Sequence, residues 1–298
     1  MKKMYAVLSL LLCLSLLSCA EARQSEYKAY ILGSTDGMAD NPAYTSDVMR
    51  LENVPSYIIE EDAVQEKTYI FEGTEYNLEY SRTKYGAPAI NHSFLCYWDR
   101  ERDVDLGFHS DTGELVYYNH LPPGRTGSDG APEDARVLTA EEREARAYEL
   151  AERYYPSSMQ KLTPDPEEHV VGSDDPKIYL WSFNRFVSGI KTTEGILIRI
   201  DEYGNFESMM IYMPDSFDDV EVEVNTEAWD QAIDDMLTTV YDSETSQYTS
   251  LTYEFRGDYY MRFNMAGDPV VNRYVVIQCT NKETGEPYSH RFTVEIDL

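Results

Sequence analysis

Residues of the kinds that usually mark catalytic or metal sites are scarce in this chain of 298 residues. It has four cysteines and five histidines, and no two histidines stand at the His-x-x-x-His spacing that ligates zinc from one helix face. Neither a Gly-x-Ser-x-Gly elbow nor a glycine-rich phosphate loop occurs. The simplest signals for acyl transfer, nucleotide use and metal catalysis are therefore missing. We expect no enzyme activity, no catalytic residue, no metal site and no cofactor.

Basic residues are also in short supply. Lys and Arg number 25 against 54 Asp and Glu, so the formal net charge is -29. Proteins that bind nucleic acid contact its phosphates through clustered Lys and Arg, and we therefore expect no nucleic-acid partner. The negative charge favours solubility and distance from an anionic cell surface. Attraction of basic peptides or cations is the alternative interpretation.

Only one apolar run is long enough to consider as a membrane segment. It extends from about Tyr5 to Leu17, short of the ~20 residues that a membrane-spanning helix needs, and Glu21 and Arg23 follow it. A basic start at Lys2 and Lys3 followed by such a run is typical of an export signal. Charged or turn residues interrupt every later run, so we expect the rest of the chain to be water-soluble and extracytoplasmic.

The end of this run, Leu16-Leu17-Ser18-Cys19, resembles a bacterial lipobox. The resemblance implies that a signal peptide, residues 1–18, is removed and that Cys19 is lipidated. Two or more acyl chains hold a protein stably on a membrane, so the expected location is the outer, extracytoplasmic face of a membrane in a bacterial cell envelope. Residues 19–53 are polar and contain Gly and Pro, which predicts a flexible tether with a short strand at 27–32.

A first module, residues 54–132, is predicted to consist mostly of β-strands. Short runs rich in Tyr, Val and Phe indicate strands at 68–71, 75–81, 90–98, 104–109 and 115–119. Turn residues separate them at Glu72–Thr74, Tyr85–Pro88 and Asp111–Gly113. Short turns of this kind are typical of antiparallel hairpins.

A helix followed by strands is predicted in a second module, residues 133–215. Thr139 and Glu142 have capping-box spacing, and the helix that they start has one apolar face that includes Leu150. Strands are predicted at 178–187, 196–200 and 206–213, with turns at 188–189, 193–195 and 201–205.

The same pattern returns in a third module, residues 216–298. Asn225 is the predicted cap of its helix, and strands are predicted at 251–255, 259–265, 270–279 and 288–296. A shift of 86 positions superposes the two helices: Leu138 on Val224, Thr139 on Asn225, Leu150 on Met236, Ala151 on Leu237 and Tyr155 on Tyr241. Helix followed by antiparallel sheet is therefore a repeated unit.

A shift of 183 positions places Cys96 on Cys279. Cysteines in an exported chain often form disulfides, but equivalent positions in successive modules are normally far apart. We therefore predict two buried free thiols, with a disulfide as the alternative.

Residues 179–190 and 196–206, with their Asp201-Glu-Tyr-Gly204 turn, resemble the core of bacterial PepSY-type domains. The resemblance covers about 138–213 and extends more loosely over 224–298. It implies an α+β fold of tandem PepSY-like or cystatin-like modules, each with one helix packed on an antiparallel sheet. It also implies a noncatalytic role, in inhibiting or chaperoning secreted peptidases or in regulation at the cell envelope.

Tyrosine is the abundant residue with a functional interpretation, since 25 are present. Tyr rings on a solvent-facing sheet provide rigid contact surface, and the candidates for binding are Tyr117, Tyr118, Tyr259 and Tyr260. Tyr is also good strand material, which is the alternative. The acidic run from Asp215 to Glu223 is predicted to be a solvated linker. Its alternative, a weak calcium site, lacks the ordered Asp-x-Asp-x-Asp-Gly loop.

The sequence thus favours a lipid-anchored, noncatalytic binding protein whose partners are the membrane, through its lipid, and a secreted protein or peptide. A peptidase inhibitor or chaperone is one alternative. A carboxylate-dependent hydrolase is the other, and it requires a cleft with two convergent acids about 5 to 10 Å apart.

Overall fold

The computed structural model describes residues 27–32, 57–84, 93–120, 136–165, 169–170, 177–212, 214–264 and 266–298. The predicted export signal, Cys19, most of the predicted tether and the turn at Tyr85–Pro88 lie outside these residues. In the described part, neither helix has the length and apolar composition that crossing a bilayer requires.

The described part of the first module contains only strands and their connections. These are β2 (Tyr57–Ile58), β3 (Glu66–Phe71), β4 (Thr74–Lys84), β5 (Phe94–Asp99), β6 (Val104–His109) and β7 (Leu115–His120). They pair antiparallel. Glu72 and Gly73, at φ 48° and 75°, make the tight turn between β3 and β4. The β-rich character predicted for this module is present.

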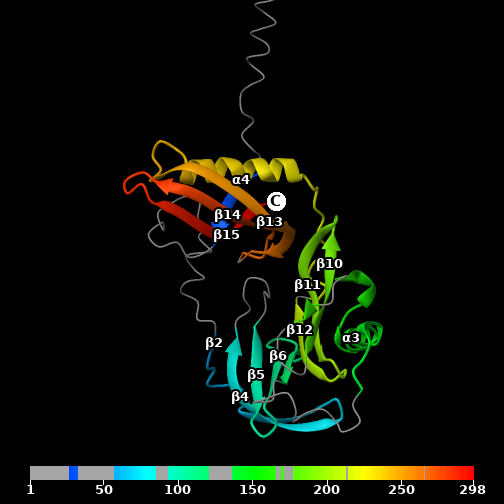
Figure 1. Ribbon diagram of the computed structural model, residues 1–298. Coiled ribbons are helices and arrows are strands. Elements are labelled where there is room, and N and C mark those ends of the chain that lie inside the picture. The colour runs from blue at the N-terminus through cyan, green and yellow to red at the C-terminus, as the bar shows by residue number, and fades with distance from the viewer. Residues whose placement is uncertain are drawn as a thin grey trace, which may run out of the picture.

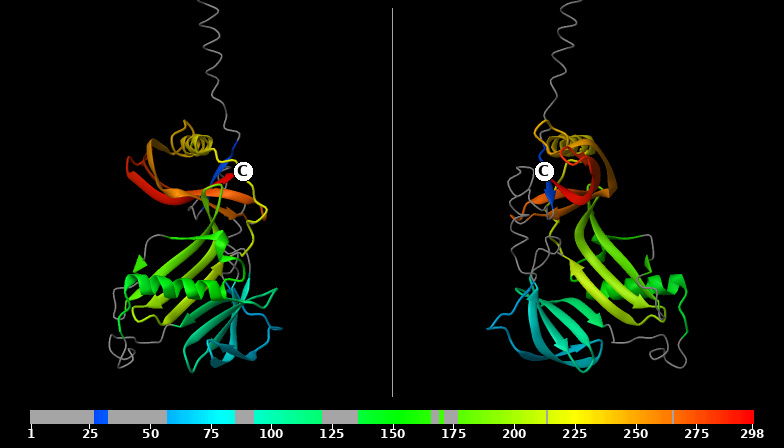
Figure 2. Two further views of the ribbon diagram at one scale, coloured as in Figure 1. Left: turned by 90° about the vertical axis from the view of Figure 1, so that its right-hand side faces the viewer. Right: turned by 60° about the vertical axis from the view of Figure 1, so that its left-hand side comes forward.

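In the second module one helix covers one face of the sheet, as the left view of Figure 2 shows. The helix is α3 (Ala140–Tyr154), and the other elements are η2 (Met159–Lys161), β8 (Leu162–Pro164), β9 (His169–Val170), β10 (Ile178–Val187), β11 (Ile190–Asp201) and β12 (Phe206–Tyr212). The predicted capping box is confirmed: Thr139 Oγ1 accepts from the Glu142 N–H, and Glu142 Oε2 accepts from the Thr139 N–H.

The third module repeats this arrangement, with α4 (Thr226–Tyr241) lying across its strands in Figure 1. The strands are β13 (Tyr248–Phe263), β14 (Pro269–Asn281) and β15 (Pro287–Asp297). A fourth strand, β1 (Ala29–Leu32), comes from the segment predicted as tether and pairs antiparallel with β15. Asn225 caps α4 by accepting from the Ala228 N–H at 3.1 Å, as predicted.

One mixed, mostly antiparallel sheet connects all three modules. β7 pairs antiparallel with β12, and one hydrophobic core spans the first and second modules. The third module has a second core, which also includes Val187 and Ile190 of the second module. It joins the second module through a parallel contact of β11 with β13 that contains only two residue pairs, Lys191 with Tyr260 and Thr192 with Met261. The second and third modules therefore meet at a narrow junction.

Equivalent positions of the two helices have equivalent surroundings. The pairs Leu150 and Met236, Ala151 and Leu237, and Tyr155 and Tyr241 are all buried. Both described cysteines are buried thiols outside any disulfide, Cys96 in the core of the first two modules and Cys279 in the core of the third. The prediction of free thiols is confirmed.

The turn predicted at 193–195 is wrong, because β11 continues through it from Ile190 to Asp201. Gly195 is present for a different reason. A Cβ at this position would lie 2.2 Å from the carbonyl oxygen of Phe183, at the bulge where β10 comes close to β11. The predicted break between 255 and 259 is also a bulge, between Arg256 and Tyr260, within the single strand β13.

The capping box gives a stability prediction. Replacing Thr139 with Ala removes the acceptor for the Glu142 N–H, and we expect the free energy of unfolding to fall by about 1 kcal/mol. Thr139→Ser, which keeps the hydroxyl group, should stay close to the wild type. Urea titrations of the three proteins test this, and an equal loss in both variants would contradict the role of the hydroxyl group.

Candidate functional site

Glu194 lies at the narrow junction between the second and third modules. One edge of β11 pairs with β13 at Lys191 and Thr192 and with β12 from Gly195 onward. Residues 193 and 194 lie in the interval, where the chain leaving β12 turns toward α4. Glu194 is 0% exposed. The residue type that was expected in a surface turn is thus a buried carboxylate.

Three donors satisfy this carboxylate. The Tyr155 hydroxyl group donates to Oε1 at 2.9 Å, the Asp215 N–H to Oε1 at 3.3 Å and the Phe217 N–H to Oε2 at 3.2 Å. Burial, together with the charge of Glu194, raises the pKa of Tyr155, which keeps the hydroxyl group protonated as a donor. The carboxylate therefore holds the turn that carries the chain into the third module. Phe217 in this turn is fully buried and packs on Phe263, with ring centroids 4.6 Å apart.

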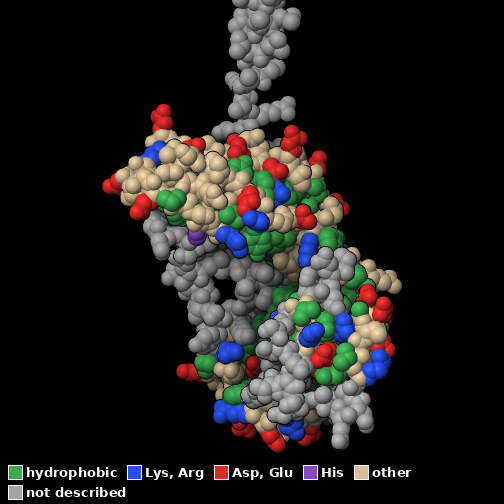
Figure 3. All heavy atoms as spheres, viewed as in Figure 1, with side chains coloured by type: hydrophobic (Ala, Val, Ile, Leu, Met, Phe, Trp, Pro, Cys, Tyr) green, Lys and Arg blue, Asp and Glu red, His purple; other side chains and the backbone are tan. Residues whose placement is uncertain are grey.

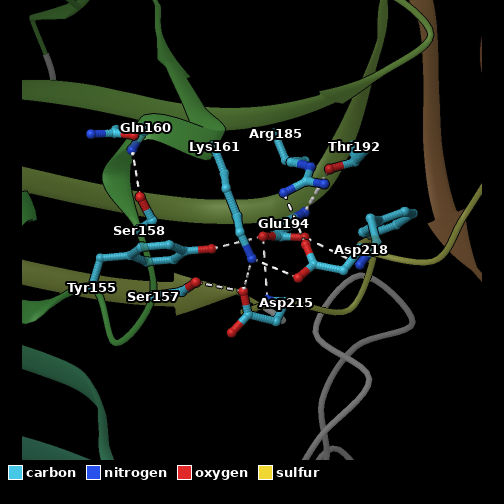
Figure 4. Close-up of polar contacts among 11 residues, drawn as sticks. Tyr155, Ser157, Ser158, Gln160, Lys161, Arg185, Thr192, Glu194, Asp215 and Asp218 are labelled. Atoms are coloured by element: carbon cyan, nitrogen blue, oxygen red, sulfur yellow. Dashed lines mark hydrogen bonds and ion pairs between the residues drawn. The ribbon is translucent and has the colours of Figure 1, made fainter.

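Ion pairs surround the buried carboxylate, as Figure 4 shows. Lys161 Nζ lies 2.5 Å from Asp215 Oδ1 and 2.6 Å from Asp218 Oδ2. Arg185 Nη1 lies 3.0 Å from Asp218 Oδ1. We name Tyr155, Lys161, Arg185, Glu194, Asp215 and Asp218 the junction cluster. Asp215 and Asp218 are exposed, as expected of a solvated linker, and both also pair with cations of the second module.

The carboxylates of the junction cluster are close enough to consider metal binding or hydrolysis, since oxygens of Glu194, Asp215 and Asp218 lie within 4.8 Å of one another. Lys161, however, already supplies a positive charge to two of them. The hydrogen bonds that Lys161 and Ser157 donate to Asp215 lower the pKa of this carboxyl group. A general acid, in contrast, needs a raised pKa. This arrangement is suited to joining two modules rather than to donating a proton.

A groove of about 950 Å³ lies beside the cluster, and we name it the junction groove. The second module lines it with Thr163, Pro164, Asp165, Ser182, Asn184, Phe186, Gly189–Thr193, Gly195–Leu197 and Tyr212, and the third with Thr226, Gly257–Tyr260 and Tyr274. Its surface is mostly apolar. Figure 3 shows hydrophobic atoms gathered along the lower edge of the third module. Two aromatic side chains in the groove remain exposed, Phe186 at 44% and Tyr274 at 47%.

A second cavity of about 670 Å³ adjoins the groove. It is lined by residues 185–188 of β10 and its turn, together with Phe217, Asp218 and 220–223. We name it the acidic pocket, after Asp218, Glu221 and Glu223. Phe186 lines both cavities and therefore stands between them.

The four tyrosines proposed for binding lie in different surroundings. Tyr260 lines the groove and stacks on Tyr274, with ring centroids 5.8 Å apart. Tyr259 also reaches the groove but is only 6% exposed, and its hydroxyl group donates to Asp230 of α4 at 2.6 Å. Tyr118 is a core residue, and Tyr117 is half-buried with its pKa raised by burial to about 12. Exposed contact surface is thus the wrong description of Tyr118 and Tyr259.

No family model matches the chain, and no curated protein matches it. The chain aligns with a solved structure, the Bacillus megaterium YpeB C-terminal domain. That alignment covers 78% of this chain and 91% of that chain, with 10% sequence identity and a TM-score of 0.31. A similarity of this size assigns neither an activity nor a ligand.

Sequence reasoning missed Phe186, Tyr274 and the junction cluster. Phe186 carried a weak signal, since it precedes the Ser188-Gly189 turn in a strand whose alternate positions are buried. Glu194 carried none, because a Thr-Glu-Gly sequence has the composition of a surface turn.

The lowered pKa of Asp215 predicts a pH dependence. A carboxyl group whose pKa is lower in the folded than in the unfolded state stabilises the fold above its ordinary pKa of 3.8, and this stability is lost as the pH falls through the folded value. The wild type should therefore lose more stability than Asp215→Asn between about pH 6 and about pH 3. Urea midpoints at both pH values measure the difference. Asp219→Asn, which changes an exposed neighbouring acid, is the matched control, and an equal effect of the two substitutions would contradict the role of Lys161.

Proposed function

We propose that this protein is a lipid-anchored, extracytoplasmic binding protein without catalytic activity, and that the junction groove is its binding site. The observation that carries the proposal is the position of Phe186 and Tyr274. Two exposed aromatic side chains lie in a mostly apolar groove between the second and third modules.

The size and lining of the groove fit this role. Binding sites are typically concave, mostly apolar and about 300 to 1,000 Å³ in volume, and the groove is about 950 Å³. Aromatic rings bury a large area at low conformational cost, which makes them frequent anchors at interfaces. The groove is bounded by strands, and such a surface fits an extended segment of a secreted protein or peptide better than a compact metabolite.

A role as inhibitor or chaperone of a secreted peptidase is the more specific form of this proposal. It follows from the PepSY resemblance of residues 179–206, and the groove supplies a surface that such a role requires. A carboxylate-dependent hydrolase is not proposed, because Lys161 and Arg185 already pair with two of the convergent acids of the junction cluster, Asp215 and Asp218, and the groove lies beside them.

The binding site can be tested with groove substitutions. Phe186→Ala and Tyr274→Ala should each lower recovery of the bound partner about tenfold or more, since truncated aromatic anchors cost at least ~1.4 kcal/mol of binding energy. The measurement is cross-linking and pull-down from the native cell surface, with bound secreted proteins quantified by mass spectrometry. Ile70→Ala, which truncates an exposed apolar side chain of the first module, is the control. Undiminished recovery by Phe186→Ala would contradict the proposal.

The membrane anchor is tested separately. We expect labelled palmitate to be incorporated into the wild type and found with the membrane fraction, whereas Cys19→Ala should incorporate none. A wild-type protein that remains unprocessed and unlabelled would refute the anchor but would leave the groove proposal standing.

A further inference from the structure

The acidic pocket narrows the class of ligand that the junction groove selects. Phe186 lines both cavities, so a side chain packed on its ring from the groove lies next to the acidic pocket. A ligand that covers this ring therefore has its neighbouring side chains within reach of the acids.

The charges of the acidic pocket are partly uncompensated. Arg185 and Lys161 both pair with Asp218. Glu221 and Glu223 make no ion pair within the described part of the chain, and the pocket is lined by no base besides Arg185. Two carboxylates thus face the pocket without a cation of their own. Such an excess attracts a positively charged group on a partner.

The edge of β10 beside this pocket is also without a strand partner. β8 pairs with residues 183–185 of β10, and in the described chain no strand continues this ladder along residues 186–187. An unpaired strand edge receives an extended peptide by backbone hydrogen bonding. The occupant favoured by this edge is therefore an extended segment rather than a folded surface.

The overall charge disfavours two other occupants. A formal net charge of -29 repels a second copy of the same chain, and it repels phosphate-bearing ligands in the same way.

We infer that the junction groove and the acidic pocket together bind an extended peptide segment in which an aromatic or apolar side chain stands next to Lys or Arg. The apolar side chain packs on Phe186 and Tyr274, and the cationic group reaches Glu221 and Glu223. This inference rests on the proposed function, because it gives the ligand class of the same groove.

Fluorescence polarisation with labelled octapeptides tests the inference on the full chain in detergent micelles. The probes alternate Phe with Lys, Phe with Glu, Phe with Gln, or Ser with Lys. We expect the Phe/Lys peptide to bind at least tenfold more tightly than the Phe/Glu and Ser/Lys peptides. Glu221→Gln combined with Glu223→Gln should weaken Phe/Lys binding about three- to tenfold at low salt and leave Phe/Gln binding unchanged.

The control pair Glu244→Gln with Glu283→Gln removes the same charge from exposed positions of the third module outside both cavities. It should leave Phe/Lys binding within about twofold of the wild type. Thermal unfolding confirms that all variants fold.

The outcomes separate the two proposals. Equal binding of the three Phe peptides with loss on Phe186→Ala would overturn the cationic preference and leave the groove as the binding site. If the control pair weakened Phe/Lys binding equally, the cationic preference would also be overturned, because the overall charge of the protein would then explain the effect. Peptide binding that Phe186→Ala leaves unchanged would overturn both. Absence of binding by every peptide would overturn the inference, while the cell-surface experiment judges the groove itself.

Discussion

A carboxylate that has no contact with solvent, that of Glu194, holds the turn through which the chain passes from the second module into the third. A buried charge is costly unless hydrogen bonds and opposite charge compensate it. Here a tyrosine hydroxyl group and two backbone N–H groups supply the hydrogen bonds, and Lys161 joins the same turn through Asp215. The strand ladder between these modules has only two residue pairs. The junction cluster connects them together with Val187 and Ile190 of the second module, which pack in the core of the third.

The candidate binding site depends on this connection. The groove takes one wall from β10 and β11 of the second module and the other from β13 and β14 of the third. Its shape follows from how the modules are held relative to each other. The acids that follow β12 divide between two roles in the structure. Asp215 and Asp218 secure the turn, whereas Glu221 and Glu223 face the adjoining pocket.

Local signals were reliable guides to the elements. Thr139 and Asn225 cap the helices as predicted, because a cap is decided by residues within one turn of each other. The shift of 86 positions identified equivalent buried side chains in both helices, since helix periodicity is also local. The prediction of a turn at 193–195 was wrong because glycine occurs both in turns and where two strands come close together. Gly195 is an example of the second, since a side chain there would meet the backbone of β10. Tyr118 and Tyr259 are buried rather than exposed, because alternation in a strand does not show which face of the sheet is covered.

The sequence by itself determined the strands and helices, their repetition, the excess of negative charge and the lipobox-like segment at Cys19. These are properties of composition and of residues close together along the chain. Only the tertiary structure decided that Glu194 is buried and that Phe186 is exposed between two cavities. The reason is that the groups around each of these two residues come from distant positions in the sequence. Tyr155 and Asp215 meet at Glu194 only after α3, β11 and the turn after β12 have packed together.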